Sequence, residues 1–164
     1  MAIIRSAVVL IPLLLLVCIL DTGETCAPNE PFYQNGCGDW YRYRRGLCMK
    51  YFDQPKYWIL AKRHCKDLGG DLLTIHSQTE RNCVRNMVTR YSQQYKGPVW
   101  IGITLIGTIY GDADGYAAIS AFWASKEPIS GKSCVAVSYD RFAFFETHNC
   151  FDRFPFFCVK KSEN

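Results

Sequence analysis

Cysteines are the residues of this chain whose type and number most directly suggest chemistry. Nine occur among 164 residues, and eight of them follow the apolar N-terminal segment. These eight are Cys26, Cys37, Cys48, Cys65, Cys83, Cys134, Cys150 and Cys158. An even number of cysteines in an exported chain is typical of a disulfide framework. Since eight cysteines can pair in about a hundred ways, the count alone leaves the connectivity open.

Other reactive side chains lack the spacing that metal binding or catalysis needs. A zinc site would need Cys-x-x-Cys or Cys/His pairs at ligand spacing, and the sequence has none. His64, His76 and His148 are scattered and accompany no catalytic motif, so we expect no enzyme and surface or supporting roles for them. Residues 112–115 match only the start of an EF-hand loop, and we predict a solvated loop tip there.

The composition fits a single globular domain. Charged residues make up 21% and hydrophobic residues 49% of the chain, which excludes a disordered protein. The formal net charge is +4, with acidic residues interspersed among the basic ones. This balance requires neither nucleic acid nor an anionic membrane as a partner, and we expect neither.

Residues 1–25 are predicted to be a secretory signal peptide. Arg5 supplies the positively charged N-terminal region of such a peptide, residues 7–20 are almost wholly apolar, and residues 21–25 are small or polar. The apolar run is short for a membrane span, although an uncleaved anchor is the alternative. No second such run follows, so we expect a secreted, extracellular protein that does not insert into a membrane after signal removal. Residues 26–36 form an irregular lead-in.

The segment Val99–Ile103 is predicted to be a buried central strand. It is short, apolar and rich in β-branched residues, and breaker residues flank it. Gly102 inside it indicates that another backbone or a large side chain approaches closely. The large apolar side chain of Trp100 belongs in the core.

A hairpin and a helix are predicted before this strand. Aromatic and polar residues alternate around a glycine over residues 37–53, which predicts a β-hairpin that Cys37 and Cys48 could join. Its arginines are expected at a solvated tip; they are Arg42, Arg44 and Arg45. Apolar residues at three- and four-residue spacing predict a helix over residues 57–68, which Gly69-Gly70 ends.

A short strand over residues 72–75 precedes a second helix. Ser77 and Glu80 form a capping box, in which the Ser77 hydroxyl bonds the Glu80 amide and the Glu80 carboxylate reaches back. The helix runs to about Gln93, with Cys83 on its apolar face.

A long loop, residues 104–133, follows the central strand. A loop of that length is usually functional or held in place by many contacts. Residues 134–137, 142–145 and 155–159 are predicted to be three closing strands. Hairpin, helix, strand, helix, strand, long loop and antiparallel strands make an α+β fold.

Several motifs follow one another in a fixed order along the chain: Cys37-Gly38-Asp39-Trp40, Trp58-x-x-Ala61-x-x-x-Cys65, Leu72-x-x-Ile75-x-Ser77-x-x-Glu80, Trp100-Ile101-Gly102-Ile103, Cys134-Val135, Cys150 and Phe157-Cys158. In this order they resemble a C-type lectin-like domain, and the lead-in is similar to that of secreted single-domain, venom-type members. The resemblance covers residues 37–161 and leaves residues 162–164 as a tail. It implies two helices packed on small antiparallel sheets, with a long loop region and stapling disulfides.

The resemblance also implies three disulfides, Cys37–Cys48, Cys65–Cys158 and Cys134–Cys150. Cys26 and Cys83 have no standard place in that pattern. Because the total is even, we favour an internal Cys26–Cys83 bond and a monomer. A disulfide-linked dimer through these cysteines is the alternative.

The family binds sugar through a calcium ion, and the resemblance places five ligand positions in this chain. They are Glu127, Ile129, Lys132, Glu146 and Thr147. Only Glu127 keeps the family's residue. Ile129 has no side-chain oxygen, and Lys132 carries a positive charge where a divalent cation would sit. Calcium binds six to eight oxygens, so we expect no calcium and no other cofactor.

The favoured hypothesis is a secreted recognition module that binds an extracellular protein or other ligand without the usual calcium–sugar site. Its ligand-binding candidates are Tyr110, Tyr116, Phe122, Glu127, Tyr139, Phe144 and Glu146, since aromatic anchors dominate interface energetics. A carbohydrate-binding lectin with a degenerate calcium site around Glu127 and Glu146 is the alternative. A matrix or mineral-binding role is a third hypothesis, which the modest positive charge disfavours.

Overall fold

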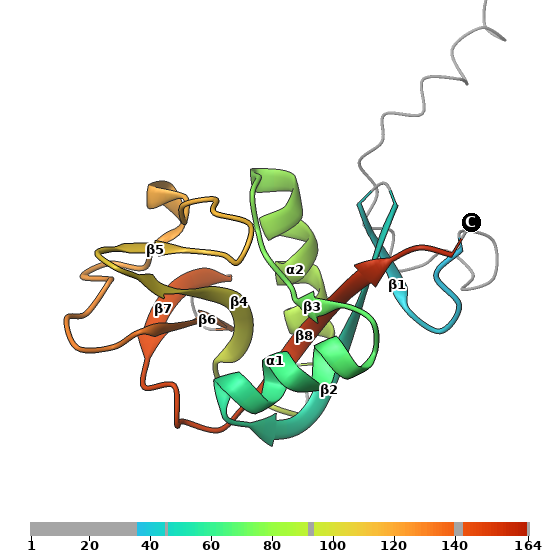
Figure 1. Cartoon of the computed structure of the whole chain (residues 1–164), viewed down its shortest axis with the longest axis horizontal. Helices are drawn as coiled ribbons and strands as arrows, with labels where there is room; N and C mark the ends of the chain where they lie inside the picture. The colour runs from blue at the N-terminus through green and yellow to red at the C-terminus, as the bar shows by residue number, and fades with distance from the viewer. Residues whose placement is uncertain (1–35, 45, 92–93, 140–142, 164) are drawn as a thin grey trace, which may run out of the picture.

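A computed structural model of the chain describes residues 36–44, 46–91, 94–139 and 143–163 (Figure 1). The predicted signal peptide and all of the lead-in except Gly36 lie outside this part. The elements are β1 (Tyr41–Arg44), β2 (Leu47–Lys56), α1 (Trp58–Asp67), β3 (Asp71–Leu72), α2 (Gln78–Tyr91), β4 (Val99–Ile106), β5 (Ile109–Gly111), the 3-10 helix η2 (Ser120–Phe122), β6 (Cys134–Ser138), β7 (Phe144–His148) and β8 (Phe154–Lys161). Across the described ranges, no helix is both long and apolar enough to cross a membrane.

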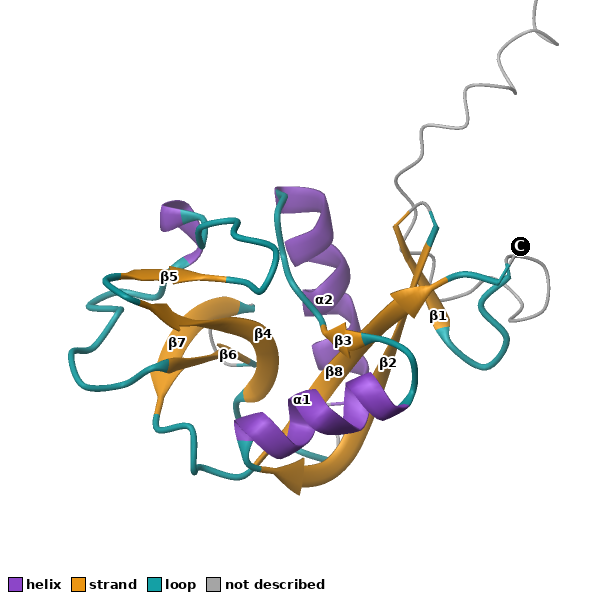
Figure 2. Cartoon of the chain, in the orientation of Figure 1, coloured by secondary structure: helices purple, strands orange, loops and turns teal. Residues whose placement is uncertain are grey.

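The strands form one sheet in the order β1-β2-β8-β4-β6-β7, with β3 paired to β8 and β5 to β4. All pairings are antiparallel except that of β4 with β8, where Trp100 lies beside Phe156. Figure 2 shows β3 between the two helices. The α+β fold with two helices and a long loop region is therefore confirmed, although one mixed sheet replaces the expected small antiparallel sheets.

The predicted central strand lies in the middle of this sheet. Val99 to Ile103 are all buried, and Trp100 has no exposed surface. The Gly102 amide donates to the Leu73 carbonyl over 2.7 Å, and a Cβ on Gly102 would lie only 2.6 Å from the Leu72 carbonyl oxygen. The glycine is needed because the backbone before α2 packs directly against β4, as the sequence predicted.

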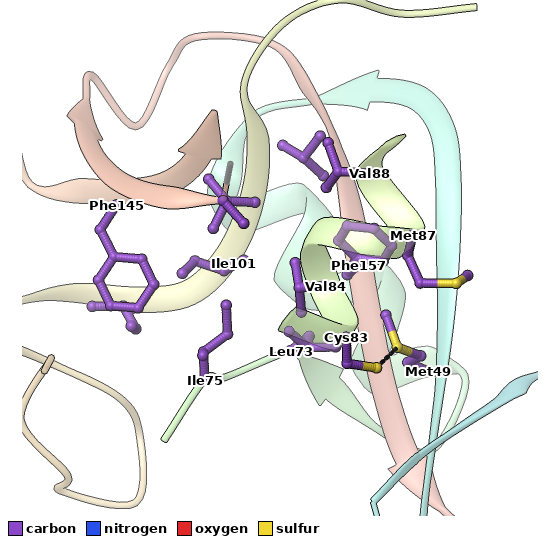
Figure 3. Close-up of a cluster of buried hydrophobic side chains, with 14 of the residues drawn as sticks. Met49, Leu73, Ile75, Cys83, Val84, Met87, Val88, Ile101, Phe145 and Phe157 are labelled. Carbon is purple, nitrogen blue, oxygen red and sulfur yellow. Dashed lines mark hydrogen bonds between the residues drawn. The ribbon is translucent and has the colours of Figure 1, made fainter. Parts of the chain in front are cut away.

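Two clusters of apolar side chains form the core. In one, the inner face of α2 packs against β2, β4 and β8 (Figure 3). In the other, Trp58 and Cys65 of α1 pack with Trp100 and Phe156. The Trp58 indole N–H donates to the Ile101 carbonyl over 2.8 Å, which fixes α1 to the central strand.

The three disulfides implied by the resemblance are present. They are Cys37–Cys48, Cys65–Cys158 and Cys134–Cys150. Cys83 is also disulfide-bonded, and its Sγ lies 3.8 Å from Met49 Sδ in the core (Figure 3). Its predicted partner, Cys26, lies outside the described residues, so a Cys26–Cys83 bond stays a prediction.

The boundaries of several predicted elements change. The strand predicted over residues 72–75 spans only Asp71–Leu72. The next residue, Leu73, donates its amide to Phe157 of β8 and accepts at its carbonyl from Gly102 of β4. The predicted loop over residues 104–133 contains the end of β4, β5 and η2. The sequence has no alternating pattern there, and the pairing of Ile106 with Ile109 across a tight turn supplies the hairpin.

The two hydrogen bonds expected around Ser77 and Glu80 are present, whereas a prediction about Arg44 was wrong in part. The Ser77 hydroxyl accepts from the Glu80 amide over 3.1 Å, and the Glu80 carboxylate reaches back to the amide of His76 over 2.6 Å. Arg44 is not simply solvated, because it pairs with the nearly buried Glu80 over 2.8 Å.

Residues 112–115 are not a fully solvated loop tip. Asp112 is only 2% exposed, and its Oδ2 lies 2.5 Å from His76 Nε2. Its Oδ1 accepts from the amides of Asp114 and Tyr116, each over 3.0 Å. The Asp112 carboxylate therefore fixes the conformation of its own loop by accepting backbone hydrogen bonds. A comparison with calcium-ligand motifs does not indicate this structural role.

Candidate ligand-binding site

Three of the five calcium-slot residues meet in one hydrogen-bonded cluster. Glu127 Oε2 accepts from the Thr147 amide over 3.0 Å, the Ile129 amide over 3.2 Å and the Thr147 hydroxyl over 2.5 Å. The Thr147 hydroxyl in turn accepts from the Ile129 amide over 2.9 Å. Thr147 is a β7 residue with 1% of its surface exposed, so the cluster joins the long loop region to the sheet.

The other two slot residues lie outside this cluster. Lys132 contributes its carbonyl oxygen, which accepts from the Tyr110 hydroxyl. Glu146 lies on β7, and its Oε2 is 3.8 Å from His148 Nε2. Burial lowers the pKa of His148, and the nearby Glu146 carboxylate opposes that effect. Over the described ranges, no three His, Cys, Asp or Glu side chains gather in a group able to hold a metal ion.

Several aromatic candidates lie near one shallow hollow. The hollow measures about 610 Å³ and is lined by Trp123, Ala124, Ser125, Lys126 and Phe144. The rings of Tyr110 and Trp123 pack edge to face at a centroid distance of 5.2 Å. We call Tyr110, residues 123–126 and Phe144 the long-loop face. Tyr139 is half-buried close to Phe144 in the sequence.

Phe122 does not belong to this face, contrary to the sequence-based expectation. It is only 4% exposed, because η2 turns its side chain into the core against Phe145. Tyr116 is 63% exposed but lines a different hollow, with Arg44, His76 and Asp114. The seven candidates therefore do not form a single site.

Arg81 is a residue near the long-loop face that the sequence reading missed. Its guanidinium lies between the rings of Phe122 and Phe144, 4.7 and 4.6 Å from their centroids. Burial lowers the pKa of Arg81, and the like charge of Arg85 adds to the effect. The three residues are far apart in the sequence, so no local pattern could have indicated this contact.

This chain belongs to the C-type lectin domain family, since the family model described as "Lectin C-type domain" matches residues 54–160. Members of this family are generally binding modules rather than enzymes.

Individual relatives agree with this assignment. The chain is 28% identical to lymphocyte antigen 75 of Mesocricetus auratus over 126 residues, which are 73% of this chain but only 7% of that protein. It is 34% identical to Snaclec 5 of Echis pyramidum leakeyi over 94 residues, 56% of this chain and 58% of the snaclec. The chain thus spans less than two thirds of both relatives. The crystal structure of human lithostathine superposes with a TM-score of 0.70 at 22% identity, over 83% of this chain and 99% of lithostathine.

Proposed function

We propose that this chain is a secreted recognition module that binds an extracellular protein through its long-loop face, without calcium. The observation that carries this proposal is the state of Glu127. Its Oε2 already accepts three hydrogen bonds from Ile129 and Thr147. A cation at that oxygen would have to displace these donors, and N–H groups repel a cation.

The residues present do not fit a calcium ion. Calcium takes six to eight oxygen ligands, most of its affinity coming from carboxylates. Ile129 offers no side-chain oxygen, Thr147 is buried, and Lys132 carries a positive charge. Glu127 and Glu146 alone supply too few oxygens, which is why we rank the degenerate calcium–sugar lectin second.

The long-loop face has the chemistry of a protein-binding surface. Trp, Tyr and Arg are the residue types that carry most binding energy in protein interfaces. Here Trp123 and Tyr110 pack edge to face, while Arg81 lies beside Phe144. Side chains held by such contacts lose little conformational freedom when a partner binds. We attribute to the chain no catalysis and no cofactor, and we regard residues 37–161 as the binding unit.

An array experiment tests this function. The labelled protein is applied to arrays of extracellular proteins and of glycans, in millimolar calcium and in EDTA. We expect a protein partner that is retained equally in both buffers, and that binds the Phe144→Ala variant more weakly. Ile59→Ala is the control, because Ile59 is 59% exposed on α1, outside the long-loop face. Retention only by glycans, and only with calcium, would contradict the proposal.

A further inference from the structure

A groove on another part of the molecule, distinct from the long-loop face, carries a second inference. It measures about 740 Å³ and runs over β3, between the end of α1 and the strand β8. A neighbouring hollow shares Arg44 and Asp114 with it and ends at Tyr116. Together they form a continuous surface, which we call the β3 groove.

Cationic side chains from three elements line the β3 groove. They are Arg44, Lys62, Lys66, Lys160 and Lys161. Lys62 and Lys66 share a single carboxylate, with Nζ atoms 3.0 and 2.8 Å from the two oxygens of Asp71. Lys161 has no carboxylate within 4.0 Å in the described part of the chain. Glu163 also lines this end of the groove, and its Oε1 lies 3.4 Å from Lys160 Nζ. The four lysines between α1 and β8 therefore outnumber the two carboxylates, Asp71 and Glu163.

Tyr116 offers a fixed aromatic surface at the other end. Tyr116 is 63% exposed, and its ring packs against His76 at a centroid distance of 5.1 Å. The loop that carries it is held by Asp112, which binds the amides of Asp114 and Tyr116 and the His76 ring. An exposed ring held in place binds a flat apolar surface with little loss of entropy.

The groove floor restricts the class of ligand. A peptide that adds a strand needs an open sheet edge, but β3 is paired with β8, Leu73 donates to Phe157, and Gly102 donates to Leu73. Single-stranded nucleic acid needs successive stacking rings, and the β3 groove exposes one ring, Tyr116. A ligand with flat apolar ring faces and anionic groups fits both ends.

We propose that the β3 groove binds a sulfated polysaccharide, with sulfates at Lys62, Lys66 and Lys161 and a sugar ring on Tyr116. Ammonium groups bind anionic oxygens through charge-assisted hydrogen bonds. Asp71 holds the two lysines of α1 in the free protein and competes with the sulfate for them. This site requires no calcium and uses none of the calcium-slot residues.

Binding of a labelled heparin oligosaccharide, measured by fluorescence anisotropy at about 0.15 M NaCl, tests the proposal. Lys66→Ala/Lys161→Ala should weaken binding about fivefold or more, since two charges leave the groove. The matched control is Arg85→Ala/Lys96→Ala, which removes two exposed charges elsewhere and should change binding less than twofold. Tyr116→Ser should weaken binding without any change in charge.

Asp71→Asn separates binding from structural damage, because it should tighten binding while every lysine variant weakens it. Melting curves of all variants establish that they are folded. Absence of binding by the wild type, equal losses in the two double variants, or weaker binding by a folded Asp71→Asn variant would each overturn the proposal. Tighter binding of an oligothymidylate than of heparin would instead assign the groove to nucleic acid and overturn it as well.

Discussion

At the scale of residues, the carboxylates that suggest chemistry in the sequence serve as acceptors for this chain's own donors. Glu80 binds the His76 amide and Arg44, Asp112 binds its own loop, and Glu127 binds Thr147. The sequence indicates an acidic side chain but not its partner, which often lies tens of residues away. For this reason Glu127 could be singled out from the sequence, whereas its hydrogen bonds could not.

His148 should make the stability depend on pH. Its ring packs against Trp100 and Phe154, and burial lowers its pKa below the ordinary value. The native state then favours the neutral ring, while the unfolded chain takes up a proton near pH 6.5. The contribution of neutral His148 to the free energy of unfolding should therefore be complete above about pH 6.5. It should be lost progressively as the pH drops below that value.

Urea unfolding at about pH 7.5 and 5.5 measures this effect, in a range where Asp and Glu stay ionised. His148→Phe should lose less stability between the two pH values than the wild type does. Some dependence should remain, because burial lowers the pKa of His64 as well. An equal loss in the wild type and in His148→Phe would show that His148 does not contribute.

At the scale of elements, segments with a periodic apolar pattern could be predicted from the sequence. Short segments whose positions depend on pairing with other strands could not. The two helices and β4 follow from their apolar patterns, and Gly102 marked the close approach to Leu72. By contrast, β3 and β5 are short, and their positions depend on pairing with β8 and β4. Such segments have no period of their own, so tertiary contacts determine them.

Trp100→Ala should destabilise the domain by about 3–5 kcal/mol, as large aromatic truncations in a core do. Trp100 is fully buried and packs on Phe154, and its indole N–H donates to the Lys56 carbonyl over 2.9 Å. Chemical denaturation measures the change, with Trp100→Phe as the milder control that keeps an aromatic ring. A near-wild-type curve for Trp100→Ala would remove Trp100 from the core.

At the scale of the whole molecule, disulfides close the fold around its sheet. Cys65–Cys158 joins α1 to β8 across 93 residues, and a loop of that size contributes roughly 4–5 kcal/mol in the chain-entropy account. The count of cysteines left this pairing open, and the resemblance to a family supplied it. The order of motifs was enough to predict the fold, but it did not predict which side chains share a surface.

Cys26 and Cys83 should form an internal disulfide, and the protein should migrate as a monomer without reductant. The lead-in is rich in proline and glycine and cannot dock by apolar burial alone, so a covalent bond would hold it. Peptide mapping of the unreduced protein should recover a linked Cys26–Cys83 peptide. A band of twice the mass that disappears in Cys83→Ser would show that these cysteines join two chains.

Calcium titration of the purified protein, followed by calorimetry and by melting temperature, tests the central claim most directly. A ligand in hundredfold excess over its Kd adds about 2.7 kcal/mol to stability, which would raise the melting temperature by several degrees. We predict no binding heat and no such rise, since Glu127 Oε2 already accepts hydrogen bonds from Ile129 and Thr147. Stoichiometric calcium binding with a rise of several degrees, both lost in Glu127→Gln, would contradict the claim.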